Sequence, residues 1–291
     1  MGIMNKVDAF GGYGMPSLFV STDELEKNLE LPGLVVVDVR PKLEFATGHI
    51  FGAVQTEWRD FSDPDSDIKG LLNPQMSCLE EKLSALGIGN ENRVVVYTDP
   101  FDSWGSEGRI YWMLSYLGHQ NVQVLDGGWV KWKREGRKTE MGFARPTSAV
   151  FKSSVRPELI VLKDEMKNLI NSRVEGACLE SHAVIDARSP KEYNGAMGPG
   201  IPRGGHVPSA INIPWDRFFN EDASIKSHED LQGIFREHNL TDDQEIICYC
   251  TGGVRSAWLL TVLQFAGYMK VRNYTGSWWE WSRDSSLPIE T

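Results

Sequence analysis

Apolar residues occur along the chain in short unbroken runs, separated by stretches with helical spacing. Four of the runs are predicted strands: residues 34–39, 93–97, 122–125 and 245–249. Continuous Val/Ile-rich runs of this length are typical of strands buried on both faces of a parallel sheet. Helical spacing at 76–86 and 104–117 ends at Gly87 and Gly118, a common residue after a helix C-terminus. The alternation predicts an α/β fold, a mostly parallel sheet with helices on both faces.

The same pattern occurs twice. Val184-Ile185-Asp186-Ala187-Arg188 repeats Val36-Val37-Asp38-Val39-Arg40, and the order of the later matches is kept. These later pairs are Gly205-His206 with Gly48-His49, 245–249 with 93–97, and Gly276-Ser277-Trp278 with Gly127-Gly128-Trp129. Internal repetition at this spacing predicts a tandem of two similar domains. We assign residues 1–140 to the first domain, 141–156 to a linker and 157–291 to the second.

Elements present in both halves are interpreted as structural. This applies to the Asp-x-Arg, Gly-His and Gly-x-Trp pairs, so His206 is predicted to make a structural hydrogen bond. A catalytic residue, in contrast, is expected in one half only.

Composition narrows the functional class. The chain has 291 residues, a net charge of −10 and 41 % hydrophobic residues, typical of globular proteins. No run approaches the length of a membrane span, and no basic face indicates nucleic acid. Residues 1–16 do not resemble a secretory signal, so a cytoplasmic location is expected. The cysteines at 78, 178, 248 and 250 form no metal-ligand pattern, and no metal or cofactor is predicted.

The stretch from 246 to 267 carries the candidate chemistry. An apolar strand leads into Cys250, two glycines follow, and a helix begins near Arg255. A loop that enters a helix presents backbone N–H groups and the positive end of the helix dipole. Thiolates are stabilised in such places and beside cations. Cys250 is therefore the predicted nucleophile, whereas Cys248 lies within the strand and is predicted to be a core residue.

The first half has no counterpart of this cysteine. Tyr249-Cys250 aligns with Tyr97-Thr98, and the loop after Thr98 is longer and acidic. Its acidic residues are Asp99, Asp102 and Glu107. This loop would repel an anion, so the first half is predicted to be inactive and to support or shape the site.

On these motifs the chain resembles the two-domain rhodanese family of sulfurtransferases over nearly its whole length. The resemblance implies an inactive N-terminal copy and a C-terminal copy whose Cys250 carries a sulfane sulfur, in a site between the domains. Backbone groups of Thr251, Gly252, Gly253 and Val254 would then hold the sulfur. Arg255 and Arg188 would bind the oxyanion of the donor.

The loop differs from the Cys-Arg-Lys-Gly-Val-Thr of thiosulfate enzymes and from the Cys-Gly-Ser-Gly-Val-Thr of 3-mercaptopyruvate enzymes. The family serine is Gly252 here, and one of the two substrate arginines of the mercaptopyruvate enzymes falls on Asn194. Arg255, or Arg203, is the candidate replacement for that cation. Thiosulfate is therefore the preferred donor and 3-mercaptopyruvate the alternative. The acceptor is expected to be cyanide or a thiol, with a thioredoxin-like reductant as a further partner.

Two other functional classes use or lack a similar cysteine loop. A cysteine phosphatase or arsenate reductase needs five residues between its cysteine and arginine, and here there are four, Thr251 to Val254. A rhodanese-like module that only binds partners would lack the cysteine, as the first half does.

Overall fold

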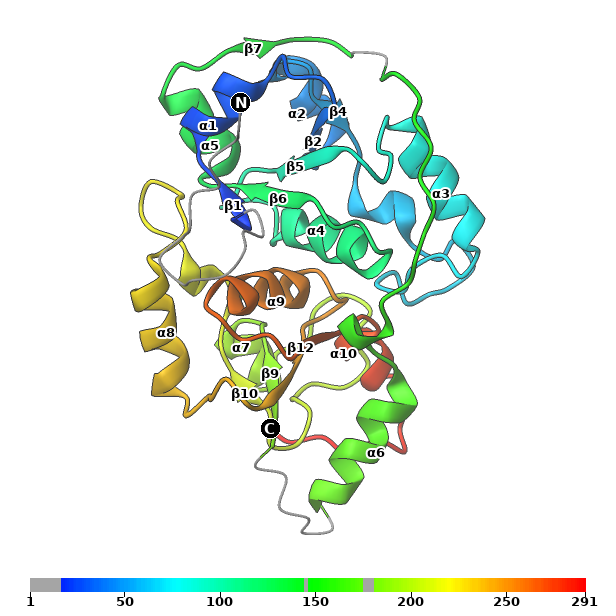
Figure 1. The fold of residues 1–291 in the computed structure, drawn as a ribbon. Coiled ribbons are helices and arrows are strands. Elements are labelled where there is room, and N and C mark those ends of the chain that lie inside the picture. Colours follow the sequence, from blue (N-terminus) through cyan, green and yellow to red (C-terminus); the bar gives the residue numbers. More distant parts are fainter. Residues whose placement is uncertain (1–16, 144–145, 175–180) are drawn as a thin grey trace.

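A computed structural model of the chain describes residues 17–143, 146–174 and 181–291, and contains two five-stranded parallel sheets. The first sheet has the order β1-β6-β5-β2-β4 (Figure 1). Its strands are β1 (Phe19–Val20), β2 (Leu34–Asp38), β4 (Val54–Gln55), β5 (Arg93–Tyr97) and β6 (Val122–Leu125). The second sheet has the order β8-β12-β11-β9-β10, which is the same arrangement. Its strands are β8 (Ile160–Val161), β9 (His182–Asp186), β10 (Ile211–Asn212), β11 (Glu245–Tyr249) and β12 (Val271–Tyr274). The predicted repeat and the α/β fold are confirmed.

Helices cover both faces of each sheet. In the first half they are α1 (Thr22–Asn28), α2 (Lys42–Thr47), η1 (Trp58–Phe61), α3 (Met76–Ala85), α4 (Ser106–Tyr116) and α5 (Gly128–Arg134). In the second half they are η2 (Pro157–Leu159), α6 (Lys163–Val174), α7 (Pro190–Tyr193), η3 (Trp215–Phe218), α8 (His228–Glu237), α9 (Arg255–Phe265) and α10 (Ser277–Trp281). Strands β3 (His49–Ile50) and β7 (Thr139–Glu140) form a separate antiparallel pair. None of the helices in the described part of the chain has the length and apolar character needed to cross a bilayer.

Alternation along the central strands explains how the two halves share a core. In β11, Ile246 and Cys248 belong to the same hydrophobic cluster as Val94 and Val96 of β5. The intervening residues, such as Ile247, belong to a separate cluster on the outer face of their own sheet. Successive strand side chains point to opposite faces. The first residue after each strand therefore continues the pattern toward the interface between the halves. Cys248 is fully buried there, as predicted.

Helices α4 and α9, which are equivalent in the repeat, pack against each other across this interface (Figure 1). A Cβ atom at Gly108 would lie 2.4 Å from the Cα of Trp258, so only glycine permits this approach. Trp258 also stacks on Phe219, with ring centroids 5.0 Å apart. The helix predicted from Trp104 begins at Ser106 instead, because Trp104 and Gly105 have φ values of 59° and 74°.

The chain between the halves is packed along the first one. Phe151 is buried in the shared core, and the backbone N–H groups of Ser154 and Arg156 donate to carbonyls at the end of α4. The domain boundaries at 140 and 157 stay predictions. The predictions for residues 1–16 and Cys178 lie outside the described residues.

Candidate active site

Cys250 directly follows β11 and begins the loop of residues 250–254, here called the cysteine loop, which leads into α9. Its N–H donates to the Ser277 hydroxyl at 3.1 Å, and its carbonyl accepts from the Trp278 N–H at 3.0 Å. The Ser256 hydroxyl donates to the sulfur at 3.6 Å. The predicted order of strand, tight loop and helix is confirmed, and the contacts hold the sulfur at the end of the interface.

The surroundings of Cys250 favour its thiolate. Burial acts to raise the pKa of this thiol, but the charge of Arg255 and hydrogen bonds from Ser256 and the Gly252 N–H together lower it below its ordinary value. Burial without such partners raises the pKa of Cys248 well above the usual range. Of these two neighbouring cysteines, Cys250 has the properties of a nucleophile.

The glycines of the cysteine loop are required by close packing. Gly253 has a φ of +74°, and a Cβ there would lie 2.8 Å from the Thr275 carbonyl oxygen. At Gly252 a Cβ would lie 2.3 Å from a ring carbon of Trp279. Larger residues at either position would displace the loop that surrounds the sulfur.

Arg255, the first residue of α9, is paired with a carboxylate. Its guanidinium donates to both oxygens of Glu192, at 2.7 and 2.8 Å, and to the Thr251 hydroxyl. Burial is the largest single effect and opposes ionisation of Glu192, but the bonds and charge of Arg255 and the bonds from Ser189 together lower the pKa of Glu192 to about 2. Much of the Arg255 charge is therefore balanced within the protein, which leaves less of it for an anionic ligand.

Arg188 is not at the cavity, contrary to the prediction that it binds substrate. Its guanidinium is buried, bonds both oxygens of Asp186 and donates to the Gly205 carbonyl oxygen at 2.8 Å. It also lies 4.5 Å from the ring centroid of Trp278. Arg40 makes the same contacts in the first half, with Asp38, Gly48 and Trp129. The pair is structural in both halves, which agrees with the interpretation of the repeated elements.

Two further candidates also have structural contacts. Arg203 donates to backbone carbonyls of the C-terminal segment, including those of Trp281 and Ser282. The Nδ1 atom of His206 lies 2.9 Å from the Tyr193 carbonyl oxygen, and its ring stacks on Tyr193.

A cavity of about 310 Å³ lies between the halves, and the cysteine loop forms part of its wall. Cys250, Thr251, Gly252, Val254 and Arg255 line it, whereas Gly253 and Arg188 do not. Thr98, the position equivalent to Cys250, lines it from the first half. The equivalence extends to backbone bonding, because the Thr98 carbonyl accepts from the Trp129 N–H at 2.8 Å.

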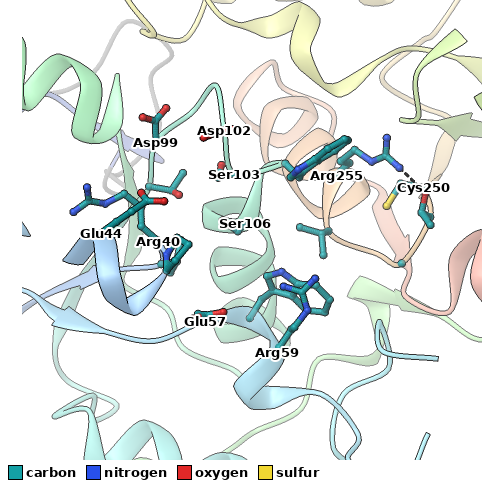
Figure 2. Close-up of a pocket in the computed structure, with 18 of the residues that line it drawn as sticks. Arg40, Glu44, Glu57, Arg59, Asp99, Asp102, Ser103, Ser106, Cys250 and Arg255 are labelled. Carbon is teal, nitrogen blue, oxygen red and sulfur yellow. Dashed lines mark hydrogen bonds between the residues drawn. The ribbon is translucent and has the colours of Figure 1, made fainter. Parts of the chain in front are cut away.

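Figure 2 shows the two sides of this cavity. Cys250 and Arg255 lie on one side, and Glu44, Asp99 and Asp102, here called the acidic wall, lie on the other. Arg59 of η1 also lines the cavity, and among the described residues it has no carboxylate within ion-pair distance. Its guanidinium lies 4.4 Å from the ring centroid of Trp58. Within the described ranges, no group of three or more His, Cys, Asp or Glu side chains is arranged to bind a metal ion.

Sequence reasoning missed the contribution of Arg109. This residue of α4 is 1 % exposed, and its guanidinium donates to the carbonyl oxygens of Gly70 at 2.6 Å and Gly253 at 3.4 Å. Burial lowers the pKa of Arg109 to about 10, against the opposing effect of the Cys250 charge. No signal in the sequence marks Arg109, because Gly253 is 144 residues away along the chain.

Comparison with known proteins places this arrangement in a family. The model for the rhodanese-like domain matches residues 21–135 and 163–284. The chain is 34 % identical over 289 residues to the sulfur carrier protein TtuD of Thermus thermophilus, covering 96 % of this chain and 98 % of that one. It is 31 % identical over 278 residues to a thiosulfate sulfurtransferase of Azotobacter vinelandii, covering 94 % and 97 %.

A solved structure agrees with the sequence comparisons. The 3-mercaptopyruvate sulfurtransferase SseA of Escherichia coli aligns with a TM-score of 0.77 at 26 % identity, covering 90 % of this chain and 99 % of that one. Two copies of the rhodanese-like domain, and relatives 31–34 % identical along nearly the whole chain, show that the chain belongs to the rhodanese family of sulfurtransferases.

Proposed function

We propose that the protein transfers a sulfane sulfur from thiosulfate to a thiophilic acceptor, with Cys250 as the carrier. The observation that supports this most strongly is the cysteine loop itself. Its nucleophile lines a cavity between the halves, and its surroundings lower the pKa of the thiol. Since the thiolate is the reactive form, such a residue suits a two-step transfer through a covalent intermediate.

The cycle begins when the Cys250 thiolate attacks the outer sulfur of thiosulfate. A new S–S bond forms, the bond to the sulfonate sulfur breaks with its electron pair, and sulfite leaves. The N–H groups of Gly252 and Ser256, which bond the thiolate, then stabilise the persulfide anion. An acceptor takes the outer sulfur in the second step and restores the thiolate.

For the donor's oxyanion we propose Arg59 together with Arg255. Arg59 lines the cavity without a carboxylate partner in the described chain, so its charge is available to a ligand. Arg255 contributes less because Glu192 holds it in a bidentate pair. Arg188 is left out of this role, because Asp186 and Gly205 occupy its guanidinium.

Two enzyme classes within the family, thiosulfate and 3-mercaptopyruvate sulfurtransferases, differ in their sulfur donor. A relative from Azotobacter vinelandii is named for thiosulfate, whereas SseA is named for 3-mercaptopyruvate. Asn194, which replaces one family arginine, is exposed on α7's C-terminal end and does not line the cavity. The residues near Cys250 therefore suit a compact dianion, and thiosulfate remains the preferred donor.

A cysteine phosphatase is disfavoured by the same geometry. Such enzymes surround a tetrahedral oxyanion with the loop and its arginine. Here the Arg255 guanidinium is bonded to Glu192 and Thr251. A rhodanese-like module that only binds partners does not require a reactive thiol, so the lowered pKa of Cys250 also argues against that alternative.

Mass spectrometry of the purified protein after incubation with thiosulfate tests the proposal. We expect the mass of one sulfur atom to be added at Cys250, no addition in Cys250→Ser, and full addition in Cys248→Ser. Addition that persists in Cys250→Ser but disappears in Cys248→Ser would reverse the assignment. Parallel steady-state kinetics with thiosulfate and 3-mercaptopyruvate would then decide between the two donors.

The acceptors we propose are cyanide in the assay and a small thiol or a thioredoxin-like reductant in the cell. A reducing cytoplasm supplies free thiols, and we propose that the protein works there.

A further inference from the structure

Glu192 of α7 does not line the cavity, but it is bonded to two residues that do, Arg255 and Thr251. The Arg255 guanidinium donates to one oxygen of this carboxylate at 2.7 Å and to the other at 2.8 Å. The Thr251 hydroxyl donates to the second of these oxygens at 3.1 Å. Glu192 therefore joins the cysteine loop and the start of α9 to α7.

The carboxylate of Glu192 is itself held in place by its own helix. Ser189, the residue before α7, donates to it from its hydroxyl at 2.8 Å and from its N–H at 3.1 Å. The Ser189 hydroxyl also accepts from the Glu192 N–H, which completes a capping box. A bidentate pair that is fixed from behind in this way holds the Arg255 guanidinium in one orientation.

Arg255 interacts with more than one anion. Its guanidinium lies beside Cys250 in Figure 2. Burial acts to lower the pKa of Arg255, but the bonds from Glu192 and the charges of Cys250, Glu192 and Asp186 together raise it. Glu192 is ionised at neutral pH, because its pKa is about 2. Its negative charge therefore offsets part of the positive charge that Arg255 presents to the thiolate and to a ligand.

The repeat shows that these contacts belong to the second half. Glu44 of the acidic wall occupies the equivalent position, since each glutamate lies equally far along the chain from its own Asp-x-Arg segment. Helix α4, the equivalent of α9, begins with Ser106 in place of Arg255. Glu44 lines the cavity, and among the residues that the structure describes it pairs with no lysine or arginine. The glutamate is thus repeated, but its contacts are present only beside the cysteine.

We propose that Glu192 is a positioning residue, which holds Arg255 and Thr251 at the cysteine loop and offsets the Arg255 charge so that oxyanions bind reversibly. This inference rests on the proposed function and adds a residue to it. Thiosulfate enters the site as a dianion and sulfite leaves it as an anion, so both meet the same positive charge. Without the counter-ion, Arg255 would hold sulfite as well as thiosulfate more tightly.

The experiment compares the full-length wild type with Glu192→Gln, which removes the charge and keeps the length of the side chain. The amide oxygen can still accept from Thr251 and from one N–H of Arg255, so the loop is expected to keep its conformation. Glu165→Gln is the matched control. Glu165 of α6 also accepts from both terminal nitrogens of an arginine, Arg272, but this pair lies outside the cavity.

We expect Glu192→Gln to lower two constants together, each by about threefold, the scale of one partly exposed charge pair. They are the half-saturating thiosulfate concentration for sulfur loading under single-turnover conditions and the inhibition constant of sulfite. The alkylation midpoint of Cys250 should move to lower pH, because less of the Arg255 charge is offset. Arg109 and Cys248 also interact with Cys250, and neither is changed in this variant. The control variant should alter none of the three measurements.

A purely structural role for Glu192 predicts the opposite signs. A loosened Arg255 would raise the half-saturating thiosulfate concentration and the alkylation midpoint. Either of these results in folded Glu192→Gln, or no change at all, would overturn the inference.

A second background tests whether Glu192 acts through Arg255. In Arg255→Met there is no cation to hold, so Glu192→Gln should have much smaller effects there than in the wild type. Equal effects in both backgrounds would show that Glu192 acts on the ligand directly and is not a positioning residue. Failure of wild-type Cys250 to gain sulfur from thiosulfate would overturn the proposed function, whereas normal loading with unchanged constants in Glu192→Gln would overturn this inference alone.

Discussion

The guanidinium of Arg109, on helix α4 of the first half, donates to the carbonyl oxygen of Gly253 in the cysteine loop of the second half, at 3.4 Å. The same side chain is fully buried and is bonded to the Gly70 carbonyl oxygen at 2.6 Å. The first half thus places a positive charge near Cys250, and the charge of Arg109 interacts with the Cys250 thiolate. This contact links the first half to the cysteine loop of the second half.

Arg109→Met should leave the protein folded, because an apolar side chain of similar length replaces a buried cation. Loss of the charge should raise the alkylation midpoint of Cys250 and slow sulfur loading. Iodoacetamide kinetics across pH, with Arg134→Met on the surface of α5 as control, measure the effect. An unchanged midpoint in folded Arg109→Met would show that this charge does not act on Cys250.

Alkylation of wild-type Cys250 should have its midpoint below the usual thiol pKa of about 8.5. Arg255 and the bonds from Ser256 and Gly252 lower this pKa despite burial, so the reactive thiolate persists to lower pH. Arg255→Met should move the midpoint upward, because the largest of these favourable effects is then lost. The Cys250→Ser variant corrects for labelling of other cysteines, and a wild-type midpoint at or above 8.5 would contradict the predicted activation.

Arg59→Met should lower kcat/KM for thiosulfate. The expected loss of transition-state stabilisation is about 1.5–3 kcal/mol, the scale of a hydrogen bond to a charged group. The loss should appear in sulfur loading and much less in transfer from the persulfide to a neutral thiol. Arg59→Lys should retain part of the activity, since it keeps the charge but loses the guanidinium fork. Arg255→Ala serves as a comparison, and a larger loss there than in Arg59→Met would make Arg255 the main anion contact.

The stability of the protein should decrease between about pH 4.5 and 8 because of Glu107 on α4. Burial raises the pKa of this carboxyl to about 8. The folded state therefore keeps a proton that the unfolded chain releases, and the free energy of unfolding declines as pH rises through this window. Glu107→Gln should remove that decline and add up to about 4 kcal/mol at pH 8. Urea unfolding at pH 5 and pH 8 measures the difference, and parallel slopes in both proteins would show that Glu107 is ionised in the fold.

The sequence predicts the central strands well and long-range contacts poorly. The predicted ranges 93–97, 122–125 and 245–249 match β5, β6 and β11, because apolar runs between turns define buried strands locally. Cys250 could be found in the same way, since the strand, glycines and helix are consecutive. The partners of Arg188 follow from the repeat, because Arg40 occupies the equivalent position in the first half and makes the same contacts.

The contributions of Arg59 and Arg109 depend on how the halves pack. Arg59 lines the cavity and Arg109 contacts the cysteine loop, both from the first half. The spacing of residues along the chain does not predict such contacts between the halves. The pairing of Arg255 with Glu192 was also beyond local reasoning, since the residues are 63 positions apart. The sequence pattern therefore does not predict which charged side chains are paired within the protein and which are available to bind a ligand.

The shared core has a consequence for how the chain unfolds. One hydrophobic cluster includes strand residues of both sheets, and Phe151 of the connecting segment is buried in it. Separation of the halves would expose Trp258 and the glycine surface of α4 to water. The two repeats should therefore melt in a single cooperative transition, and a protease cut at the connection should leave both pieces associated. Although the chain contains two copies of one domain, we expect it to unfold as one thermodynamic unit.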